Sequence, residues 1–144
     1  APTCACKKWL SPGGSRLTLY GAHRLTPGAD VLVICENPVD SLLIRQEWEG
    51  DAVATLGVSI WKDEYTEIVC QAAPQQIVVW FDNDAPGQAT NPAILAEWAA
   101  RHPHAPPLNG IKLTNRLLAA GLPAVFYRWG DDAPIGADIG DFFK

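Results

Sequence analysis

The stretch VLVICENPVD, residues 31–40, decides the fold of this chain. Its first five residues form a continuous apolar run rich in β-branched side chains, which is typical of a strand buried on both faces of a parallel sheet. Glu36, Asn37 and Pro38 then turn the chain, and the apolar spacing over residues 39–48 predicts a helix. An acidic residue, Glu36, therefore follows directly on a buried strand.

The alternation of strand and helix continues along the chain. Further strands are predicted at residues 52–56, 76–81 and 124–129, and further helices at residues 60–70, 92–101 and 111–120. This order predicts an α/β domain with a mainly parallel, four-stranded sheet and helices on both faces. We expect the domain to occupy residues 31–144, after a loop-rich lead-in over residues 1–30 that contains a short strand at 16–20 and a helical turn at 20–25.

The composition narrows the class of protein. A length of 144 residues indicates one compact domain. The net charge of −5 disfavours a domain that simply coats nucleic acid, although it permits an enzyme whose carboxylates hold divalent cations. No apolar run reaches the ~20 residues that span a bilayer, so a cytoplasmic protein without membrane contact is expected. The absence of methionine indicates a domain cut from a longer protein.

The four cysteines do not suggest a disulfide framework. Cys35 lies in the apolar strand and Cys70 in a predicted helix, so both are expected to be small buried hydrophobic residues. A zinc site is an alternative for the remaining two, together with two histidines, although their spacing differs from that of common zinc modules. The residues concerned are Cys4, Cys6, His102 and His104.

Three carboxylates fall at the carboxyl ends of predicted strands. Glu36 follows the first strand, and Asp82 and Asp84 follow the strand at residues 76–81. Ligands of open α/β sheets bind at this edge, and hard oxygen ligands from two strand ends suit Mg²⁺. Each motif alone has an equally good structural interpretation, because acidic residues often cap helices and Asp-Asn-Asp is common in turns.

The order of these motifs resembles that of a Toprim domain. Residues 31–40 are similar to the first Toprim signature, an apolar strand followed by Glu-Gly-x-x-Asp, and residues 52–57 are similar to the second, a short strand that ends in glycine. Residues 78–87, VVWFDNDAPG, resemble the Asp-x-Asp-x-x-Gly element and are closest to its form in primases and primase-helicases. The resemblance implies a Rossmann-like Toprim fold.

The resemblance also implies a catalytic metal site. Glu36, Asp82 and Asp84 would be the catalytic residues and the ligands of Mg²⁺ or Mn²⁺, supported by Asp40, Gly57 and Gly87. A further metal ligand is expected in the acidic tail, at Asp138 by position, with Asp141 as the second candidate. The structural alternative for this tail is an acidic loop that caps a short terminal helix.

The chain departs from the family pattern beside the catalytic glutamate, and it also lacks the lysine of the tail motif before Asp138. Asn37 stands where the family usually has glycine beside the catalytic glutamate. Asparagine is the non-glycine residue best able to take a left-handed backbone, so we expect the turn to be kept in that conformation. Its side chain is expected to occupy space that glycine would leave open to substrate.

The function implied by the resemblance is Mg²⁺-dependent nucleotidyl transfer in a primase-like DNA replication protein, which makes RNA or DNA primers from nucleoside triphosphates. Single-stranded DNA template, other domains of the parent protein or a helicase would be its partners. The chain is expected to bind metal without priming alone, because it lacks a basic surface for the template. Phosphodiester cleavage of the nuclease or topoisomerase type, or a metal-binding interaction module without catalysis, are the alternatives.

Overall fold

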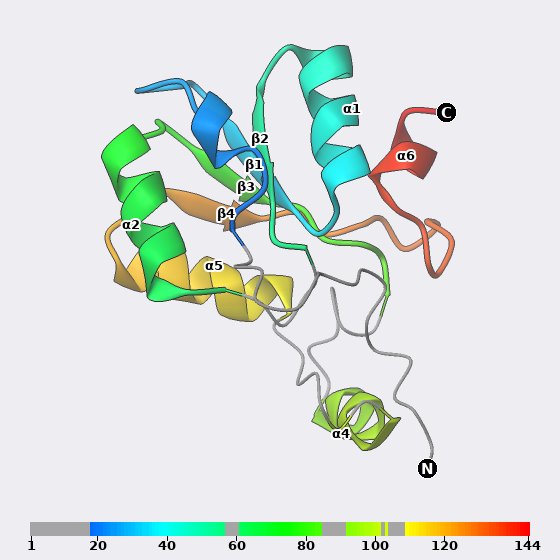
Figure 1. Cartoon of the computed structure of the whole chain (residues 1–144). Helices are drawn as coiled ribbons and strands as arrows, with labels where there is room; N and C mark the ends of the chain where they lie inside the picture. Colours follow the sequence, from blue (N-terminus) through cyan, green and yellow to red (C-terminus); the bar gives the residue numbers. More distant parts are fainter. Residues whose placement is uncertain (1–17, 57–60, 85–91, 102, 104–108) are drawn as a thin grey trace, which may run out of the picture.

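A parallel sheet of four strands forms the centre of the molecule (Figure 1). The structure, a computed structural model, describes residues 18–56, 61–84, 92–101, 103 and 109–144. The strands are β1 (Leu32–Cys35), β2 (Asp51–Ala54), β3 (Ile77–Val79) and β4 (Ala124–Phe126). They lie in the order β2-β1-β3-β4, and every pairing is parallel. The predicted α/β class is therefore confirmed, with a sheet consistent with a Rossmann-like fold.

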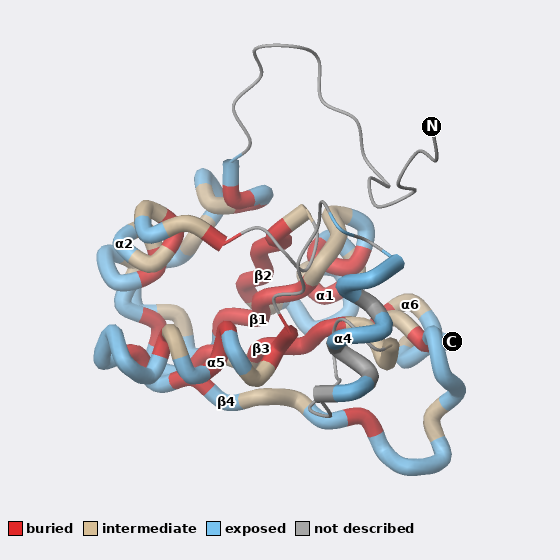
Figure 2. The backbone as a smooth tube through the Cα atoms, turned by 90° about the horizontal axis from the view of Figure 1, so that it is seen from below, coloured by how far each residue is buried: buried red, intermediate tan, exposed pale blue. Residues whose placement is uncertain are grey.

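Burial on both faces explains the continuous apolar run of β1. All four residues of β1 are buried, and they alternate between two hydrophobic cores. Leu32 and Ile34 belong to one core, and Val33 and Cys35 belong to the other. Because neither face of the strand meets water, no polar residue interrupts the run. Figure 2 shows the buried residues concentrated in the central strands.

Helices cover both faces of the sheet, as predicted (Figure 1). On one face, α2 (Asp63–Ala72) and α5 (Gly110–Ala119) contribute apolar side chains to the larger core. On the other face, α1 (Pro38–Trp48) and α6 (Ile139–Phe142) pack over the smaller core, which also contains Trp80 and Trp129. One more helix, α4 (Pro92–Arg101), begins at the predicted proline. No helix in the described part of the chain is long and apolar enough to cross a membrane.

The segment before β1 packs against the larger core. Leu19 is buried in the larger core, and Tyr20 forms an isolated antiparallel bridge with Ala54 at the outer side of β2. The 3-10 turn η1 (Ala22–Arg24) follows, where a helical turn was expected. Of the strand predicted at residues 16–20, the structure describes residues 18–20, and there only this single bridge is present.

Several local predictions were wrong. α2 begins at Asp63 rather than at residue 60, and Cys70 is exposed rather than buried. The buried residues of α2 are Tyr65 and Val69, four positions apart, so the adjacent Cys70 faces away from the core. The last two strands are also shorter than predicted, since β3 ends at Val79 and β4 ends at Phe126.

A glycine ends α5 in the predicted place. Gly121 has a left-handed backbone with φ of 82°. Its N–H donates to the carbonyl oxygen of Leu118, and the N–H of Leu122 donates to that of Leu117, which is the pattern of a Schellman motif. The chain is thereby turned toward β4.

We expect Gly121→Ala to lower the free energy of unfolding by about 1 kcal/mol, because an L side chain is disfavoured in the left-handed region. No atom lies within 4 Å of the added Cβ, so the loss would report backbone conformation alone. Urea unfolding measures it. Gly50→Ala is the matched control, because the φ of Gly50 is not positive and its nearest neighbour for a Cβ is at 4.0 Å. Equal stability of the two variants would contradict this explanation.

Candidate metal centre

Parallel pairing of β1 with β3 brings the acidic residues to one edge of the sheet. Leu32 pairs with Ile77 and Ile34 with Val79, and the N–H of Trp80 donates to the carbonyl oxygen of Ile34 at 2.9 Å beyond the end of β3. The two chain segments therefore leave the sheet side by side, with Glu36 on one and Asp82 on the other. This is the edge at which ligands of parallel sheets bind.

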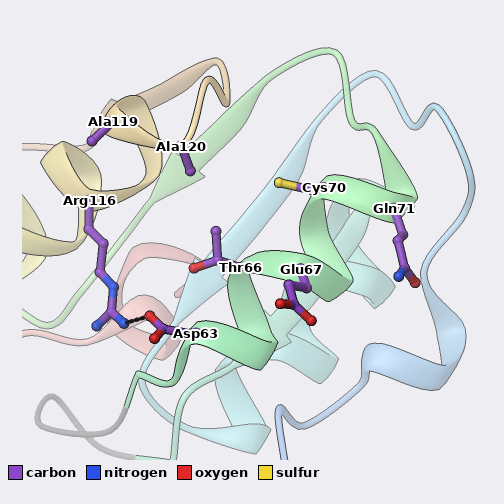
Figure 3. Close-up of a pocket in the computed structure, with 8 residues that line it drawn as sticks. All are labelled: Asp63, Thr66, Glu67, Cys70, Gln71, Arg116, Ala119 and Ala120. Atoms are coloured by element: carbon purple, nitrogen blue, oxygen red, sulfur yellow. Dashed lines mark hydrogen bonds and ion pairs between the residues drawn. The ribbon is translucent and has the colours of Figure 1, made fainter.

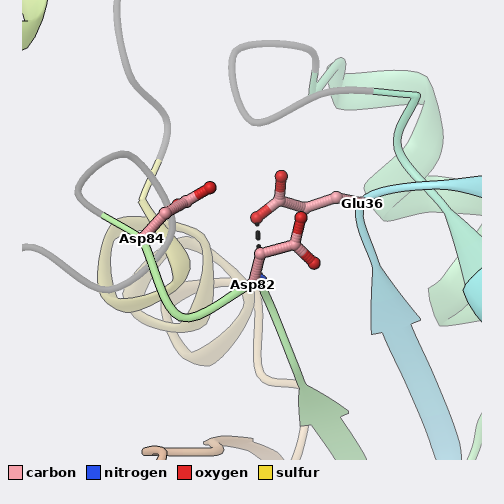
Figure 4. A group of neighbouring side chains, drawn as sticks. All are labelled: Glu36, Asp82 and Asp84. Atoms are coloured by element: carbon pink, nitrogen blue, oxygen red, sulfur yellow. Dashed lines mark hydrogen bonds between the residues drawn. The ribbon is translucent and has the colours of Figure 1, made fainter. Parts of the chain in front are cut away.

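The three predicted carboxylates converge there. Glu36, Asp82 and Asp84 each offer one oxygen, and these oxygens lie within 4.8 Å of one another (Figure 4). The backbone N–H of Asp82 donates to Glu36 Oε1 at 3.0 Å, and the N–H of Asp84 donates to the carbonyl oxygen of Asp82 at 2.9 Å. The second bond closes a tight turn, which directs Asp84 back toward the other two residues.

Burial and mutual repulsion act on Glu36. Burial raises its pKa well above the ordinary value for glutamate, and the negative charges of Asp82 and Asp84 raise it further. The hydrogen bond from the Asp82 amide acts in the opposite direction but is a smaller effect. The folded chain therefore holds three half-buried carboxylates at a distance where their charges repel, and a proton or a cation would relieve that repulsion.

The donor set fits a hard divalent cation. All three side chains are oxygen donors, which Mg²⁺ and Mn²⁺ prefer over nitrogen or sulfur donors. They come from two strand ends and a turn, so waters or phosphate oxygens could complete the coordination. Among the residues that the structure describes, no other group of His, Cys, Asp or Glu side chains meets this geometry.

The backbone of Asn37 does not have the expected left-handed conformation. Its backbone is extended, with φ of −124° and ψ of 154°, so the left-handed conformation predicted from the glycine of the family pattern was wrong. Asn37 is the N-cap of α1. Its Oδ1 accepts from the N–H of Asp40 at 3.0 Å, and its Nδ2 donates to Asp40 Oδ2 at 2.5 Å. An asparagine can supply this cap, whereas glycine has no side chain to do so.

Asp40 has a structural position in the first turn of α1. It is only 2% exposed, and the amide of Asn37 binds its carboxylate. Its charge contributes to the raised pKa of Glu36, after those of the two aspartates of the triad. Asp40 therefore affects the site electrostatically without belonging to the group of three converging oxygens.

Asp138 also lies at a helix terminus. It is the N-cap of α6, where its Oδ1 accepts from the N–H of Asp141 and Asp141 Oδ2 accepts from the N–H of Asp138, both at 3.0 Å. These contacts match the structural alternative for the acidic tail. Among the described residues the converging group does not include Asp138. Metal binding by Asp138 stays a prediction.

Asn83, which the sequence did not single out, ties the acidic turn to the loop before α6. Its Nδ2 donates to the carbonyl oxygens of Ala133 at 3.2 Å and Pro134 at 2.9 Å. Its backbone N–H donates to Ala137, and its carbonyl oxygen accepts from Gly136. The residue between the two aspartates thus fixes loop 133–137 against the site. In the sequence, only the position of Asn83 between the two aspartates indicated a role for this residue.

Several other predicted residues lie outside the described part of the chain. They are the supporting glycines of the family pattern and the alternative zinc ligands, namely Gly57, Gly87, Cys4, Cys6, His102 and His104.

A groove lies between α2 and α5, away from the triad (Figure 3). It has a volume of about 630 Å³, and an ion pair between Arg116 and Asp63 crosses one end. Its lining includes the exposed Cys70 but no convergent set of metal ligands. Unlike the sheet edge, this groove therefore offers no candidate metal site among its described residues.

No family model, curated protein or solved structure matches this chain.

The raised pKa of Glu36 predicts a pH-dependent stability of the metal-free protein. The folded state holds the Glu36 proton more tightly than the unfolded chain, so stability is greatest below the ordinary glutamate pKa and falls as pH rises through the raised value. Glu36→Gln imitates the protonated form and still accepts the Asp82 hydrogen bond. We expect this variant to match the parent at pH 4 and to exceed it in stability at pH 8, measured by urea unfolding with a chelator.

Glu67→Gln is the control, because it removes the same charge from an exposed position on α2. It should change stability by the same small amount at both pH values. A Glu36→Gln variant that gains no stability at pH 8 would show that the triad is not electrostatically strained.

Proposed function

We propose that Glu36, Asp82 and Asp84 bind Mg²⁺ or Mn²⁺, and that the chain is a Toprim-type domain for nucleotidyl transfer in a primase-like replication protein. The observation that supports this most is the convergence of the three carboxylates at the carboxyl edge of a parallel sheet. Residues that are 46 positions apart in sequence meet there in the order of the Toprim motifs. The proposed reaction is primer synthesis from nucleoside triphosphates on single-stranded DNA.

The three carboxylates would have different roles in this reaction. Asp82 and Asp84, on one tight turn, would hold the metal, which when bound neutralises phosphate charge and orients the reacting groups. Glu36 would either share the metal or accept the proton of the attacking hydroxyl. A raised pKa suits proton transfer near neutral pH, whereas a bound cation would lower that pKa again.

The negative charge of the chain indicates that partners would have to bind the template. With a net charge of −5, it offers little attraction to the phosphates of a template. Template contact would come from other domains of a parent protein or from a helicase. This is the reason for expecting metal and nucleotide binding from the chain, but no primer synthesis by it alone.

Metal binding is tested by titrating the protein with Mn²⁺ and following it by electron paramagnetic resonance or calorimetry. We expect one saturable site, weakened at least about tenfold by Asp82→Asn or Asp84→Asn, because each removes a charged ligand. Affinity should fall as pH is lowered through the raised pKa of Glu36, since protons compete with the metal. Glu67→Gln, at an exposed glutamate on α2, is the charge-matched control. Equal weakening by the control would refute a localised site.

Activity separates the proposed reaction from its alternatives. With Mn²⁺, nucleoside triphosphates and single-stranded DNA, the chain alone should bind nucleotide and make no primer. The same protein should leave supercoiled plasmid intact. Nicking that is abolished by Asp82→Asn would instead favour phosphodiester cleavage, and metal binding without nucleotide binding would favour a non-catalytic module.

A further inference from the structure

A second hollow lies beside the acidic turn, on the side of β4. It has a volume of about 520 Å³ and lies between the end of β4, the start of α5 and the loop after β4. Asn83, the residue between Asp82 and Asp84, forms part of its wall. The hollow, called here the β4 pocket, thus shares a residue of the acidic turn and opens at the sheet edge where ligands of such folds bind.

The lining of the β4 pocket combines apolar and charged groups. Phe126, Ile111 and Ile135 provide apolar surface, and the lining carries one cation, Arg128, and one anion, Asp131. Ile135 is 93% exposed, so its side chain is accessible to a ligand. Apolar side chains beside a guanidinium, in a wall that also offers polar groups, suit a flat organic group that carries phosphate.

The pocket and the triad are mechanically connected. The hydrogen bonds of Asn83 to Ala133 and Pro134 fix the loop that carries Ile135, and the same residue separates the two aspartates. A ligand could therefore contact the pocket wall and the metal at once, because both are held by one short segment. Arg128 pairs with Asp131 at 3.3 Å, and both side chains are largely exposed, so the guanidinium can exchange partners at little cost.

We propose that the β4 pocket binds the base and sugar of a nucleoside triphosphate whose phosphates reach the metal at the triad, with Arg128 against the phosphates and Ile135 against the base. This inference rests on the proposed function and adds a location for the nucleotide. It assigns the nucleotide to the β4 side of the triad, away from the capped start of α1.

The test compares ATP with inorganic triphosphate on Mn²⁺-loaded protein by calorimetry. We expect ATP to bind more tightly, because only ATP fills the pocket. Ile135→Ser should weaken ATP binding about three- to tenfold and leave triphosphate binding unchanged, since it removes apolar contact alone. Arg128→Gln should weaken both ligands by a similar factor. Both side chains are exposed, so neither change threatens the fold.

Arg24→Gln is the matched control, because it removes an exposed arginine near the opposite edge of the sheet. Arg24 is two residues before Thr26, and the N–H of Thr26 donates to the carboxylate of Asp51 at the amino end of the edge strand β2. The control should bind both ligands like the parent. Equal affinity of the parent for ATP and triphosphate, or unchanged ATP binding by Ile135→Ser, would overturn the pocket assignment while Mn²⁺ binding persists. Absence of Mn²⁺ binding in the parent would overturn the proposed function and this inference together.

Discussion

The parallel pairing of β1 with β3 is the constraint on which the rest of the site depends. Its register sets the ends of the two strands side by side, and the bond from Trp80 to Ile34 carries the pairing past the end of β3. From that point the amide of Asp82 can reach the carboxylate of Glu36, 46 residues earlier in the chain. A shift of one residue in this register would reverse the direction of every β3 side chain and separate the carboxylates.

The triad is unfavourable to the metal-free fold, and the two cores around it supply the compensating stability. β1 is buried on both sides, so the strand end that carries Glu36 has little freedom to move away from Asp82. The repulsion that raises the pKa of Glu36 is the same repulsion that a divalent cation would relieve. Metal affinity and the strain of the metal-free state would thus have one physical origin, which is expected where function and stability compete.

The sequence predicted the elements whose position is determined by burial of apolar side chains. It predicted less well the local structure that depends on polar contacts. Continuous apolar runs predicted β1 and β3, and parallel pairing then predicted the meeting of Glu36 with Asp82. The backbone of Asn37 was mispredicted, because a family pattern with glycine suggested a turn geometry while the side chain could cap α1 instead. The contacts of Asn83 with a loop 50 residues away have no periodic signal, so only the folded structure reveals them.

The two sides of the triad differ in what their polar groups do. On the β1 side, Asn37 and Asp40 bind each other at the start of α1, so their hydrogen-bonding capacity serves the fold. On the β4 side, Asn83 holds a loop in place, and Arg128 lines a pocket that opens beside the acidic turn. The proposed phosphorylated ligand would need a cation and a cavity close to the triad, and on the β4 side Arg128 and the β4 pocket lie beside the acidic turn. A ligand of the triad would therefore approach from the β4 side. This difference between the two sides follows from the sheet order, since the loop after β4 lies next to β3 and far from β2.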